Sequence, residues 1–360
     1  MALDLDPGRT AVGNPRLVDA IREEMAGGAM PFERFMELAL YHPEHGYYRK
    51  PGRIGTGGDF LTSPAIHPMF GWAVGGWCQW VWEQAGRPPE FAIIEPGAGE
   101  GRLAAAILDW AAGRDDGFGK AIRYVAIEPH NAGDDERVEW RTTLPEPVEH
   151  GVVVANELFD AFPVRLFEAG PRGPVEVHVR WDEEEARFVE APGAVWTIEG
   201  APDAGRFELN PRAYPAMEQL CGLVARGAVL VFDYGYPQEE LWAPWRTQGT
   251  LLCFYRHTAH EDPLIHVGEQ DITSHVNLSE LAGAAEEAGM RVSGPIPQSE
   301  FLWALGLGQL VDAARGDMNE YFTRRRALTQ LTDGAGLGRI RVLAATRGID
   351  GVPPGFEASE

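Results

Sequence analysis

The sequence predicts an α/β fold built around a mainly parallel, helix-covered sheet. Short apolar runs rich in β-branched residues have the length and composition of buried strands, and they cover residues 91–95, 121–127, 150–155 and 227–233. Segments with helical spacing or polar composition separate these runs. Strands that alternate with such connections favour a parallel sheet, and residues 339–345 add an antiparallel closing strand.

A glycine-rich turn follows the first of these runs. Glu95 ends the run, and Gly97, Gly99 and Gly101 stand at alternate positions after it. Glycine lets the backbone turn tightly and approach a ligand closely, and Leu103 opens a helical pattern. The segment therefore predicts a Rossmann-like, nucleotide-type cofactor site at a strand-to-helix turn. An ordinary tight turn is the competing interpretation.

The charge and spacing of this turn favour a cationic cofactor over a dinucleotide. The third glycine comes one residue earlier than in the dinucleotide pattern G-x-G-x-x-G. Glu95 would repel a diphosphate, whereas a carboxylate suits a positively charged ligand. S-adenosylmethionine carries a sulfonium and an amino group and no phosphate. We therefore expect it as the cofactor, with Glu95 facing its cationic end.

The second run ends in Glu128 and Pro129. An acidic residue that closes the strand after a glycine turn is the usual partner of ribose hydroxyls, because one carboxylate accepts hydrogen bonds from both. We therefore expect Glu128 to bind the ribose of the cofactor. The competing interpretation is a solvent-facing glutamate before a turn-forming proline.

The third run ends in a polar cluster formed by Asn156, Glu157 and Asp160. Ligands of open α/β sheets bind beyond the carboxyl ends of the strands, which is where this cluster would fall. Two carboxylates and an amide beside a methyl donor would orient a basic nucleophile and partly neutralise it. Alternatively, Asn156 caps a short helix whose first turn favours the two acidic residues.

The remaining segments complete the expected organisation. Helical spacing predicts helices at 15–25 and 31–41, and Ser63 would cap a helix that continues through Val81. Alternating residues between 164 and 207 predict an antiparallel excursion. Further helices are expected at 211–225, 278–288 and 299–314. The expected domains are an N-terminal helical and glycine-rich cap (1–90), a cofactor-binding core (91–233), a substrate-side insertion (234–290), C-terminal helices with the closing strand (291–347) and a flexible tail (348–360).

Residues 234–277 have little helical period but many reactive side chains, including His257 and His275. Such density in an irregular segment indicates a cover on the substrate side of the core. Either histidine would serve as a base for a phenol acceptor. Histidines here are equally expected as structural hydrogen-bond partners.

Composition and charge exclude several classes of function. The chain of 360 residues has a formal net charge of -23, which argues against a nucleic-acid partner. No apolar run reaches the length of a membrane span, and the N-terminus lacks the features of a signal peptide, so we expect a cytoplasmic protein. Three scattered cysteines predict core thiols and no metal site.

Six sequence blocks point to a known family: residues 41–48, 58–64, 95–101, 155–163, 232–235 and 271–276. Together they resemble the MidA-like methyltransferases, a family that includes a mitochondrial arginine methyltransferase assisting the assembly of respiratory complex I. The resemblance runs from about Pro31 to Leu307. It implies the sheet of class I methyltransferases, S-adenosylmethionine as donor and, in the mitochondrial member, symmetric dimethylation of a protein arginine. Asn277 departs from the acidic residue usual in the family, which would remove a charge near the cover.

With this resemblance, the expected site has a donor side and an acceptor side. Gly97, Gly99 and Gly101 would shape the donor pocket, together with Glu95, Glu128 and Asn156, and the segment with Asp59, Phe60 and Thr62 would close over the donor. Glu157, Asp160 and His257 are the candidate catalytic residues. The acceptor, a protein arginine or a small O- or N-nucleophile, and the oligomeric state stay open. A non-catalytic assembly factor that retains the fold is the third hypothesis.

Overall fold

The computed structural model describes residues 12–49, 61–130 and 133–357, and Asp59 and Phe60 lie outside these ranges. The chain forms two compact units, each made of several chain segments. The first unit comprises residues 1–60, 160–212 and 238–275, and the second comprises 61–159, 213–237 and 276–360. The expected domain boundaries were wrong at the N-terminus, because the cap predicted for 1–90 divides between the two units. The excursion and most of the insertion fall in one unit.

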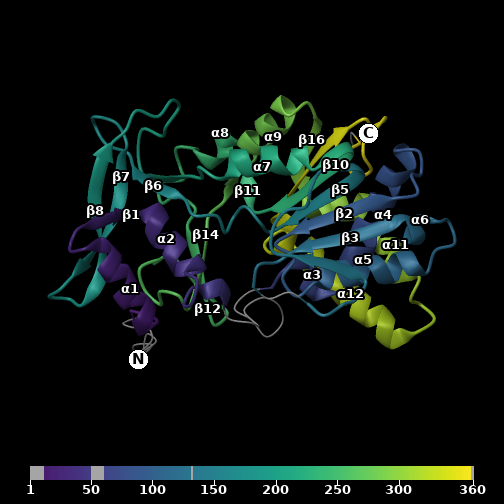
Figure 1. Ribbon diagram of the computed structural model, residues 1–360, viewed down its shortest axis with the longest axis horizontal. Helices are drawn as coiled ribbons and strands as arrows, with labels where there is room; N and C mark the ends of the chain where they lie inside the picture. Colours follow the sequence, from purple (N-terminus) through teal and green to yellow (C-terminus); the bar gives the residue numbers. More distant parts are fainter. Residues whose placement is uncertain (1–11, 50–60, 131–132, 358–360) are drawn as a thin grey trace. The chain divides into compact units, whose positions relative to one another are not determined.

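A seven-stranded sheet forms the centre of the second unit (Figure 1). Five strands are parallel to one another in the order β10-β5-β2-β3-β4, and β17 pairs antiparallel with β10. The edge strand β16 pairs antiparallel with β17. This arrangement confirms the predicted parallel sheet with an antiparallel closing strand. The strands are β2 (Phe91–Pro96), β3 (Ile122–Ile127), β4 (Val138–Arg141), β5 (Val148–Asn156), β10 (Val224–Asp233), β16 (Arg291–Pro297) and β17 (Arg341–Arg347).

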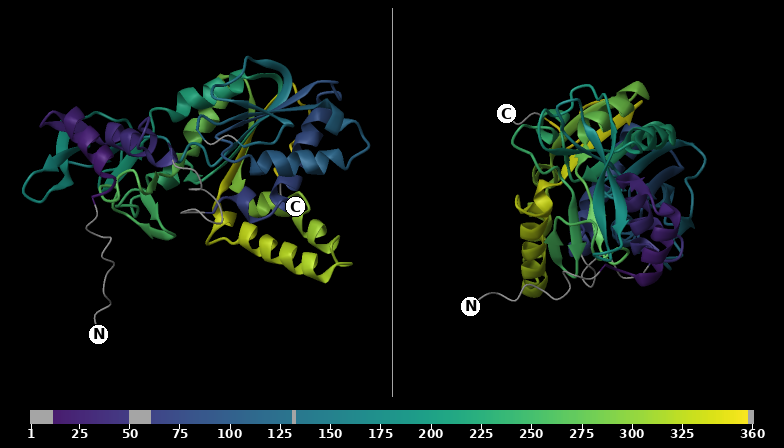
Figure 2. Two further views of the ribbon diagram at one scale, coloured as in Figure 1. Left: turned by 60° about the horizontal axis from the view of Figure 1, so that its bottom comes forward. Right: turned by 90° about the vertical axis from the view of Figure 1, so that its left-hand side faces the viewer.

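Helices cover both faces of this sheet. On one face, α4, α5 and the C-terminal helices bury an apolar core that includes Trp77, Ile107 and Leu230. On the other face, α7 and α9 pack together and contact β10 and β17, respectively. The C-terminal α11 and α12 lie side by side (Figure 2). The helices are α3 (Ser63–Ile66), α4 (Met69–Gln84), α5 (Arg102–Ala112), α6 (Phe118–Ala121), α7 (Ala213–Gly222), α9 (Leu278–Glu287), α10 (Gln298–Ala304), α11 (Leu307–Asp312), α12 (Met318–Thr332) and the 3-10 turn η3 (Leu337–Arg339). Short strands β11 (Gly235–Tyr236) and β15 (Val276–Asn277) pair with each other.

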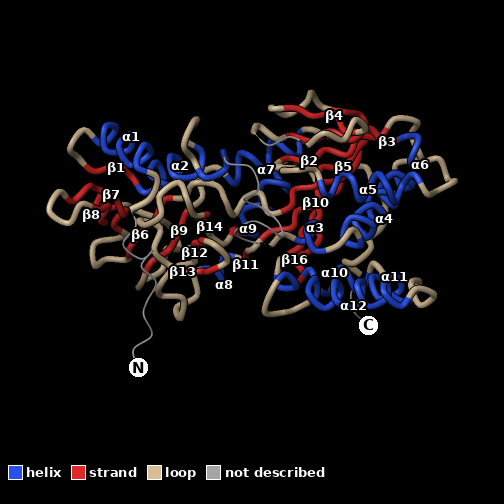
Figure 3. Tube along the Cα trace, turned by 90° about the horizontal axis from the view of Figure 1, so that it is seen from below, coloured by secondary structure: helices blue, strands red, loops and turns tan. Residues whose placement is uncertain are grey.

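The first unit has an antiparallel sheet, as predicted for the excursion. β1, β7, β6 and β9 follow one another in the sheet, and β8 pairs with β7. Helices α1 and α2 share an apolar core with this sheet. Short strands and long loops form the rest of the unit (Figure 3). The elements are α1 (Pro15–Met25), β1 (Ala29–Pro31), α2 (Phe32–Tyr41), η2 (Tyr47–Arg49), β6 (Arg165–Glu168), β7 (Val175–Asp182), β8 (Arg187–Val195), β9 (Arg206–Leu209), α8 (Gln238–Leu241), β12 (Leu252–Tyr255), β13 (Thr258–His260) and β14 (Asp271–Thr273).

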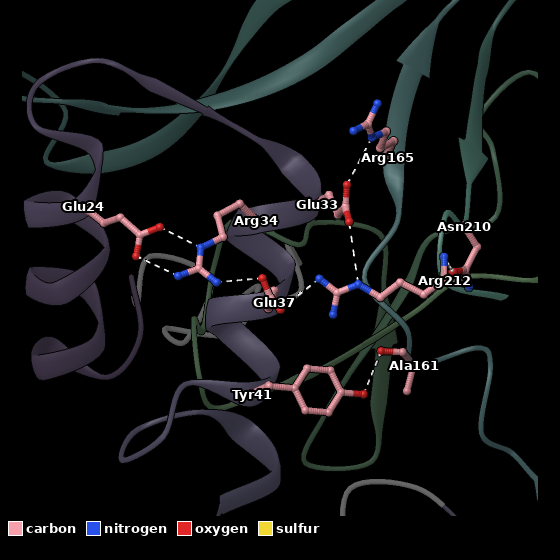
Figure 4. A network of polar contacts seen from close by, with 9 residues as sticks. All are labelled: Glu24, Glu33, Arg34, Glu37, Tyr41, Ala161, Arg165, Asn210 and Arg212. Atoms are coloured by element: carbon pink, nitrogen blue, oxygen red, sulfur yellow. Dashed lines mark hydrogen bonds and ion pairs between the residues drawn. The ribbon is translucent and has the colours of Figure 1, made fainter. Parts of the chain in front are cut away.

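A network of ion pairs fastens α2 to its neighbours in this unit (Figure 4). Arg34 bridges Glu24 of α1 and Glu37 of its own helix, at 2.6 and 2.7 Å. Arg212 and Arg165 extend the network through Glu37 and Glu33. The side chains of Arg34, Arg165 and Arg212 are each more than a third exposed, so each ion pair adds at most about 1 kcal/mol to stability. The network mainly sets the orientation of α2.

Two observations limit other interpretations of the fold. Within the described ranges, no helix has the length and apolar character needed to cross a membrane. Among the same residues, no group of three or more His, Cys, Asp or Glu is arranged to hold a metal ion. The three cysteines are free and buried, which confirms the predicted core thiols.

Leu230 in β10 provides a test of the central core. Its side chain is 0% exposed, so Leu230→Ala should lower the free energy of unfolding by about 2–5 kcal/mol because it leaves a cavity. Met318 is 57% exposed, and Met318→Ala should change that free energy by less than about 0.5 kcal/mol. Urea denaturation of both variants measures the difference. Similar losses in the two variants would contradict this assignment of the core.

Candidate active site

The glycine turn joins the end of β2 to the start of α5. Gly97, Gly99 and Gly101 have φ values of 72°, 53° and 77°, a region that side chains other than glycine disfavour. The backbone N–H of Gly97 donates to the carbonyl of Ile127, at the end of the neighbouring β3, at 2.9 Å. A Cβ on Gly101 would lie 2.7 Å from Cη2 of Trp140. The structure therefore confirms that this turn requires glycine and leaves bare backbone at the carboxyl edge of the sheet.

Glu128 lies directly after β3 and fastens two loops together. Its Oε2 accepts a hydrogen bond from the N–H of Gly99 at 3.1 Å, and its Oε1 accepts from the N–H of His130 at 3.0 Å. Glu128 thus stands beside the glycine turn, where the sequence places it as a ribose ligand.

A recess of about 330 Å³ opens beside Glu128. Trp140, Arg141, Thr142 and Thr143 line it, at and after the end of β4. The indole of Trp140 also packs under Gly101, so the same ring shapes both the recess and the turn. An aromatic ring and hydroxyl groups next to the Glu128 carboxylate suit the adenine base of the donor.

Glu95 differs from the expected charged partner of the cofactor. It is 4% exposed, and the hydroxyl of Tyr124 donates to its Oε2 at 2.7 Å. Burial raises the pKa of Glu95 from 4.5 to about 8, although the Tyr124 hydrogen bond acts in the opposite direction. The side chain is therefore mostly protonated at pH 7 in this structure. A cation brought next to it would favour ionisation.

Asn156 and Glu157 stand at the carboxyl end of β5. Oε1 of Glu157 accepts from Nδ2 of Asn156 at 3.2 Å and from the N–H of Ser63 at 3.3 Å. Oδ1 of Asn156 is buried and has no hydrogen-bond partner among the described residues. A buried carbonyl oxygen without a donor is costly, so this atom points to a bound group that carries N–H or O–H.

Asp233 holds the turn that contains these residues. Its Oδ2 accepts from the N–H groups of Leu158 and Phe159, at 3.2 and 2.8 Å, and its Oδ1 accepts from the N–H of Tyr234 at 2.9 Å. Glu157 has a φ of 50°, an uncommon conformation for a residue with a side chain. Burial raises the pKa of Asp233, and the nearby charge of Glu157 adds to this effect.

Thr62, Asp160 and His257 are the other predicted site residues within the described ranges. Thr62 directly precedes α3, and no side-chain hydrogen bond to the helix accompanies it. Asp160 belongs to the first unit, where it is buried and its carbonyl accepts from the N–H of Ser274 at 2.9 Å. His257 also belongs to that unit and lies exposed in the turn between β12 and β13, with a φ of 64°. This exposed turn gives no support for a base.

Asn277 has a structural role that accounts for its departure from the family pattern. Its Oδ1 accepts from the N–H groups of Ser279 and Glu280, at 3.1 and 3.3 Å, and so caps α9. Asparagine and aspartate cap helices about equally well. An asparagine at this position therefore keeps the helix cap and lacks the charge of the acidic residue usual in the family.

The residues of the second unit fit a bound S-adenosylmethionine. The glycine turn leaves open space where a Cβ on Gly99 would lie, and the Glu128 carboxylate stands beside it, bonded to the N–H of Gly99. Glu157 supplies a carboxylate at the same edge of the sheet, and Glu95 would ionise with a cation next to it. A parallel sheet with these groups at its carboxyl edge is the arrangement of a class I methyltransferase.

Comparisons with known proteins agree with this class. The chain belongs to the family of S-adenosyl-L-methionine-dependent methyltransferases whose model matches residues 73–296. It is therefore a methyltransferase that uses S-adenosylmethionine as donor.

Named relatives and a solved structure resemble most of the chain. The mouse and human forms of protein arginine methyltransferase NDUFAF7, mitochondrial, are each 28% identical, over 346 and 345 residues. These alignments cover 84% of this chain in both cases, and 76% and 75% of the relatives. A Burkholderia thailandensis protein crystallised with S-adenosyl-homocysteine is 32% identical, with a TM-score of 0.87 over 99% of this chain and 98% of that one.

Sequence reasoning missed several residues of this site. Tyr124 and Trp140 lie within strands and read as ordinary core residues, although both contact the donor side. Asp233 ends an apolar run in the same way as Glu95, and this position could have marked it as a site residue. Ser63 and Gln298 could not be recognised as residues of the site from the sequence, because their hydrogen-bond partners are distant along the chain.

Gly101 and Gly99 provide a matched pair for testing the contact between the glycine turn and Trp140. Both have a left-handed backbone conformation, but only a Cβ at Gly101 would collide with Trp140. Gly99→Ala should cost about 1 kcal/mol of stability, and Gly101→Ala about 1–3 kcal/mol more, with a donor affinity lowered by at least roughly tenfold. Urea denaturation and calorimetry with S-adenosylmethionine measure these effects. Equal losses in both variants, or no partial recovery on adding Trp140→Phe to Gly101→Ala, would contradict the assigned contact.

The raised pKa of Glu95 predicts a pH dependence of stability. Above pH 4.5 the unfolded chain releases this proton, whereas the folded protein retains it up to about pH 8. The folded state then binds more protons, so the contribution of Glu95 to stability is complete below pH 4.5 and is lost as pH rises to about 8, by at most about 1.4 kcal/mol per pH unit. Glu95→Gln should remove this slope in urea denaturation between pH 5 and 8. Parallel curves for wild type and variant would show that Glu95 does not retain the proton.

Proposed function

We propose that this methyltransferase transfers the methyl group to the guanidinium of a protein arginine. The observation that carries the proposal is the pair of acceptor groups at the end of β5. Oδ1 of Asn156 is buried with no hydrogen-bond partner in the described part of the chain, and the carboxylate of Glu157 is held 3.2 Å from the Asn156 amide. A guanidinium offers five N–H donors and a positive charge, which suits an amide oxygen beside a carboxylate.

The chemistry of this acceptor requires such groups. Bound S-adenosylmethionine supplies a methyl group on a positively charged sulfonium, which is already activated for transfer. The chain's own residues must align the acceptor nitrogen, exclude water and take up the proton that methylation releases. A guanidinium holds its protons very tightly, so the proton becomes acidic only as the methyl group is transferred. We assign Oε1 and Oε2 of Glu157 to orient the guanidinium and to accept this proton.

Asp233 fixes the backbone beside Glu157, because its Oδ2 accepts from the N–H groups of Leu158 and Phe159. The nearby charge of Glu157 adds to the raised pKa of Asp233, since like charges in a buried site disfavour double ionisation. Asp160 and His257 are assigned no role in this proposal.

The named relatives support the choice of arginine, because they are called protein arginine methyltransferases. A small-molecule nitrogen nucleophile would use the same groups and is the alternative acceptor. A carboxylic acid acceptor is disfavoured, since it would place a further negative charge beside Glu157. The cytoplasmic location and the absence of a nucleic-acid partner stay predictions, the latter from the net charge.

A labelling experiment tests the acceptor class. The purified protein is incubated with methyl-tritiated S-adenosylmethionine and protein extract from cells that lack it, and labelled peptides are analysed by mass spectrometry. We expect methylated arginine in a small set of proteins. Label confined to small molecules, or to side chains other than arginine, would overturn the proposal.

Glu157→Gln tests the acceptor role of the carboxylate. The variant should lower kcat by roughly a hundredfold on the labelled target, because general-base catalysis contributes about this much. The affinity for S-adenosyl-homocysteine, measured by calorimetry, should change by less than roughly twofold. Glu149 is exposed near the opposite end of β5, and Glu149→Gln is the matched control. Unchanged turnover in Glu157→Gln would remove Glu157 from the acceptor site.

A further inference from the structure

Ser63 departs from the role that its position in the sequence predicts. It precedes a proline at the start of α3, where a serine hydroxyl ordinarily caps the helix. Here Thr62 occupies the cap position, and the Ser63 hydroxyl donates instead to Oε1 of Gln298 at 3.0 Å. Both side chains are fully buried. A serine that does not cap its helix and is instead buried against a second polar side chain indicates that contacts elsewhere in the structure fix its place.

Gln298 is itself held by the surrounding backbone. Its Nε2 donates to the carbonyls of Leu331 and Leu337, each at 3.1 Å, and its backbone N–H donates to the carbonyl of Ile340. The carboxamide therefore uses both N–H groups and its oxygen. These contacts join the start of α10 to the end of α12 and to η3. A buried amide with every group satisfied cannot rotate without losing several hydrogen bonds.

The same serine contacts the acceptor side of the site. The N–H of Ser63 donates to Oε1 of Glu157 at 3.3 Å. The backbone of Glu157 is fixed separately, since its N–H donates to the carbonyl of Phe232 at 2.7 Å and Asp233 binds the two residues that follow it. The contacts of Asp233 thus fix the backbone next to Glu157, and the N–H of Ser63 restrains the Glu157 carboxylate.

We propose that Ser63 and Gln298 are positioning residues that hold the Glu157 carboxylate in the orientation used for the methyl acceptor. This inference rests on the proposed role of Glu157. The hydroxyl of Ser63 anchors α3 to Gln298, and Gln298 is anchored to the C-terminal helices, so the N–H that binds Glu157 has a fixed place. A carboxylate held in advance needs no reorganisation when the acceptor binds.

Through these contacts the C-terminal helices would affect the orientation of Glu157 without touching the substrate. α12 buries Ala327 and Leu331 in the core, and the carbonyl of Leu331 is one of the two that hold the Gln298 amide. A shift at the end of α12 would reach Glu157 through two buried side chains. The groups that align the acceptor therefore extend well beyond the carboxyl edge of the sheet.

Ser63→Ala tests this proposal, because it removes the hydroxyl and keeps the N–H that binds Glu157. The first readout is the ratio of the affinities for S-adenosylmethionine and S-adenosyl-homocysteine, measured by calorimetry. These ligands differ by the methyl group and the positive charge, and a Cβ on Gly97 would lie 3.2 Å from Leu158, so the turn with Glu157 adjoins the donor loop. The second readout is kcat on the labelled arginine target.

We expect Ser63→Ala to lower kcat by roughly fivefold to tenfold, which corresponds to the loss of one buried hydrogen bond. The affinity ratio should shift toward that of Glu157→Gln, with the affinity for S-adenosyl-homocysteine within roughly twofold of wild type. Ser63→Cys has similar volume and a weaker donor, so it should fall between wild type and alanine. It also gives a folded comparison if the alanine variant is unstable. Thr346→Val removes another buried hydroxyl at the sheet and should change neither readout.

Three outcomes separate this inference from the proposed function. Wild-type kcat and affinity ratio in Ser63→Ala, with Glu157→Gln impaired, would overturn the positioning role alone. Equal loss of affinity for both ligands in Ser63→Ala would also overturn it, since that result indicates general damage to the fold. Normal turnover in Glu157→Gln would instead overturn the acceptor role of Glu157 and the proposed function with it.

Discussion

The hydrogen bonds that converge on the buried Asp233 carboxylate are the constraint on which the acceptor side depends. They come from the N–H groups of Leu158, Phe159 and Tyr234, and so they join the ends of two neighbouring strands, β5 and β10. The turn they close holds Glu157 in a left-handed conformation that an unrestrained chain would rarely adopt. Strain of this kind persists where surrounding contacts over-determine it, and it places the Glu157 side chain beside Asn156.

The site gathers acidic groups where the sheet excludes water. In the described part of the chain, neither Glu95 nor Asp233 forms a salt bridge, and burial raises the pKa of both. Glu95 instead accepts from Tyr124, and Asp233 accepts from backbone N–H groups. Two acids kept close to neutrality avoid the full desolvation cost of buried charge. A cationic donor next to Glu95 would favour ionisation of this carboxyl group.

Particular residues show where sequence reasoning succeeded and where it failed. Helix α1 was predicted with its observed bounds because its apolar spacing and opening proline are local features. Strands β4 and β16 and helix α12 were not predicted. Helix α12 is largely polar and carries the run Arg324 to Arg326, so it lacks a clear apolar pattern. Ser63 was expected to cap a helix, and Asn277 was noted only for the charge that it removes. Each hydroxyl or amide had two possible uses, and only the folded neighbours decide between them.

The sequence by itself determined the parallel sheet, the glycine turn, the position of Glu128 directly after a strand and the cationic donor. Strand periodicity, glycine φ preference and charge act over only a few residues. Only the tertiary structure decided the protonation of Glu95, the place of Trp140 under Gly101 and the chain of contacts from Gln298 through Ser63 to Glu157. These properties depend on burial and on partners far apart in the sequence. The glycine turn could be identified from its own residues, whereas the acceptor side needed the packing of the whole sheet.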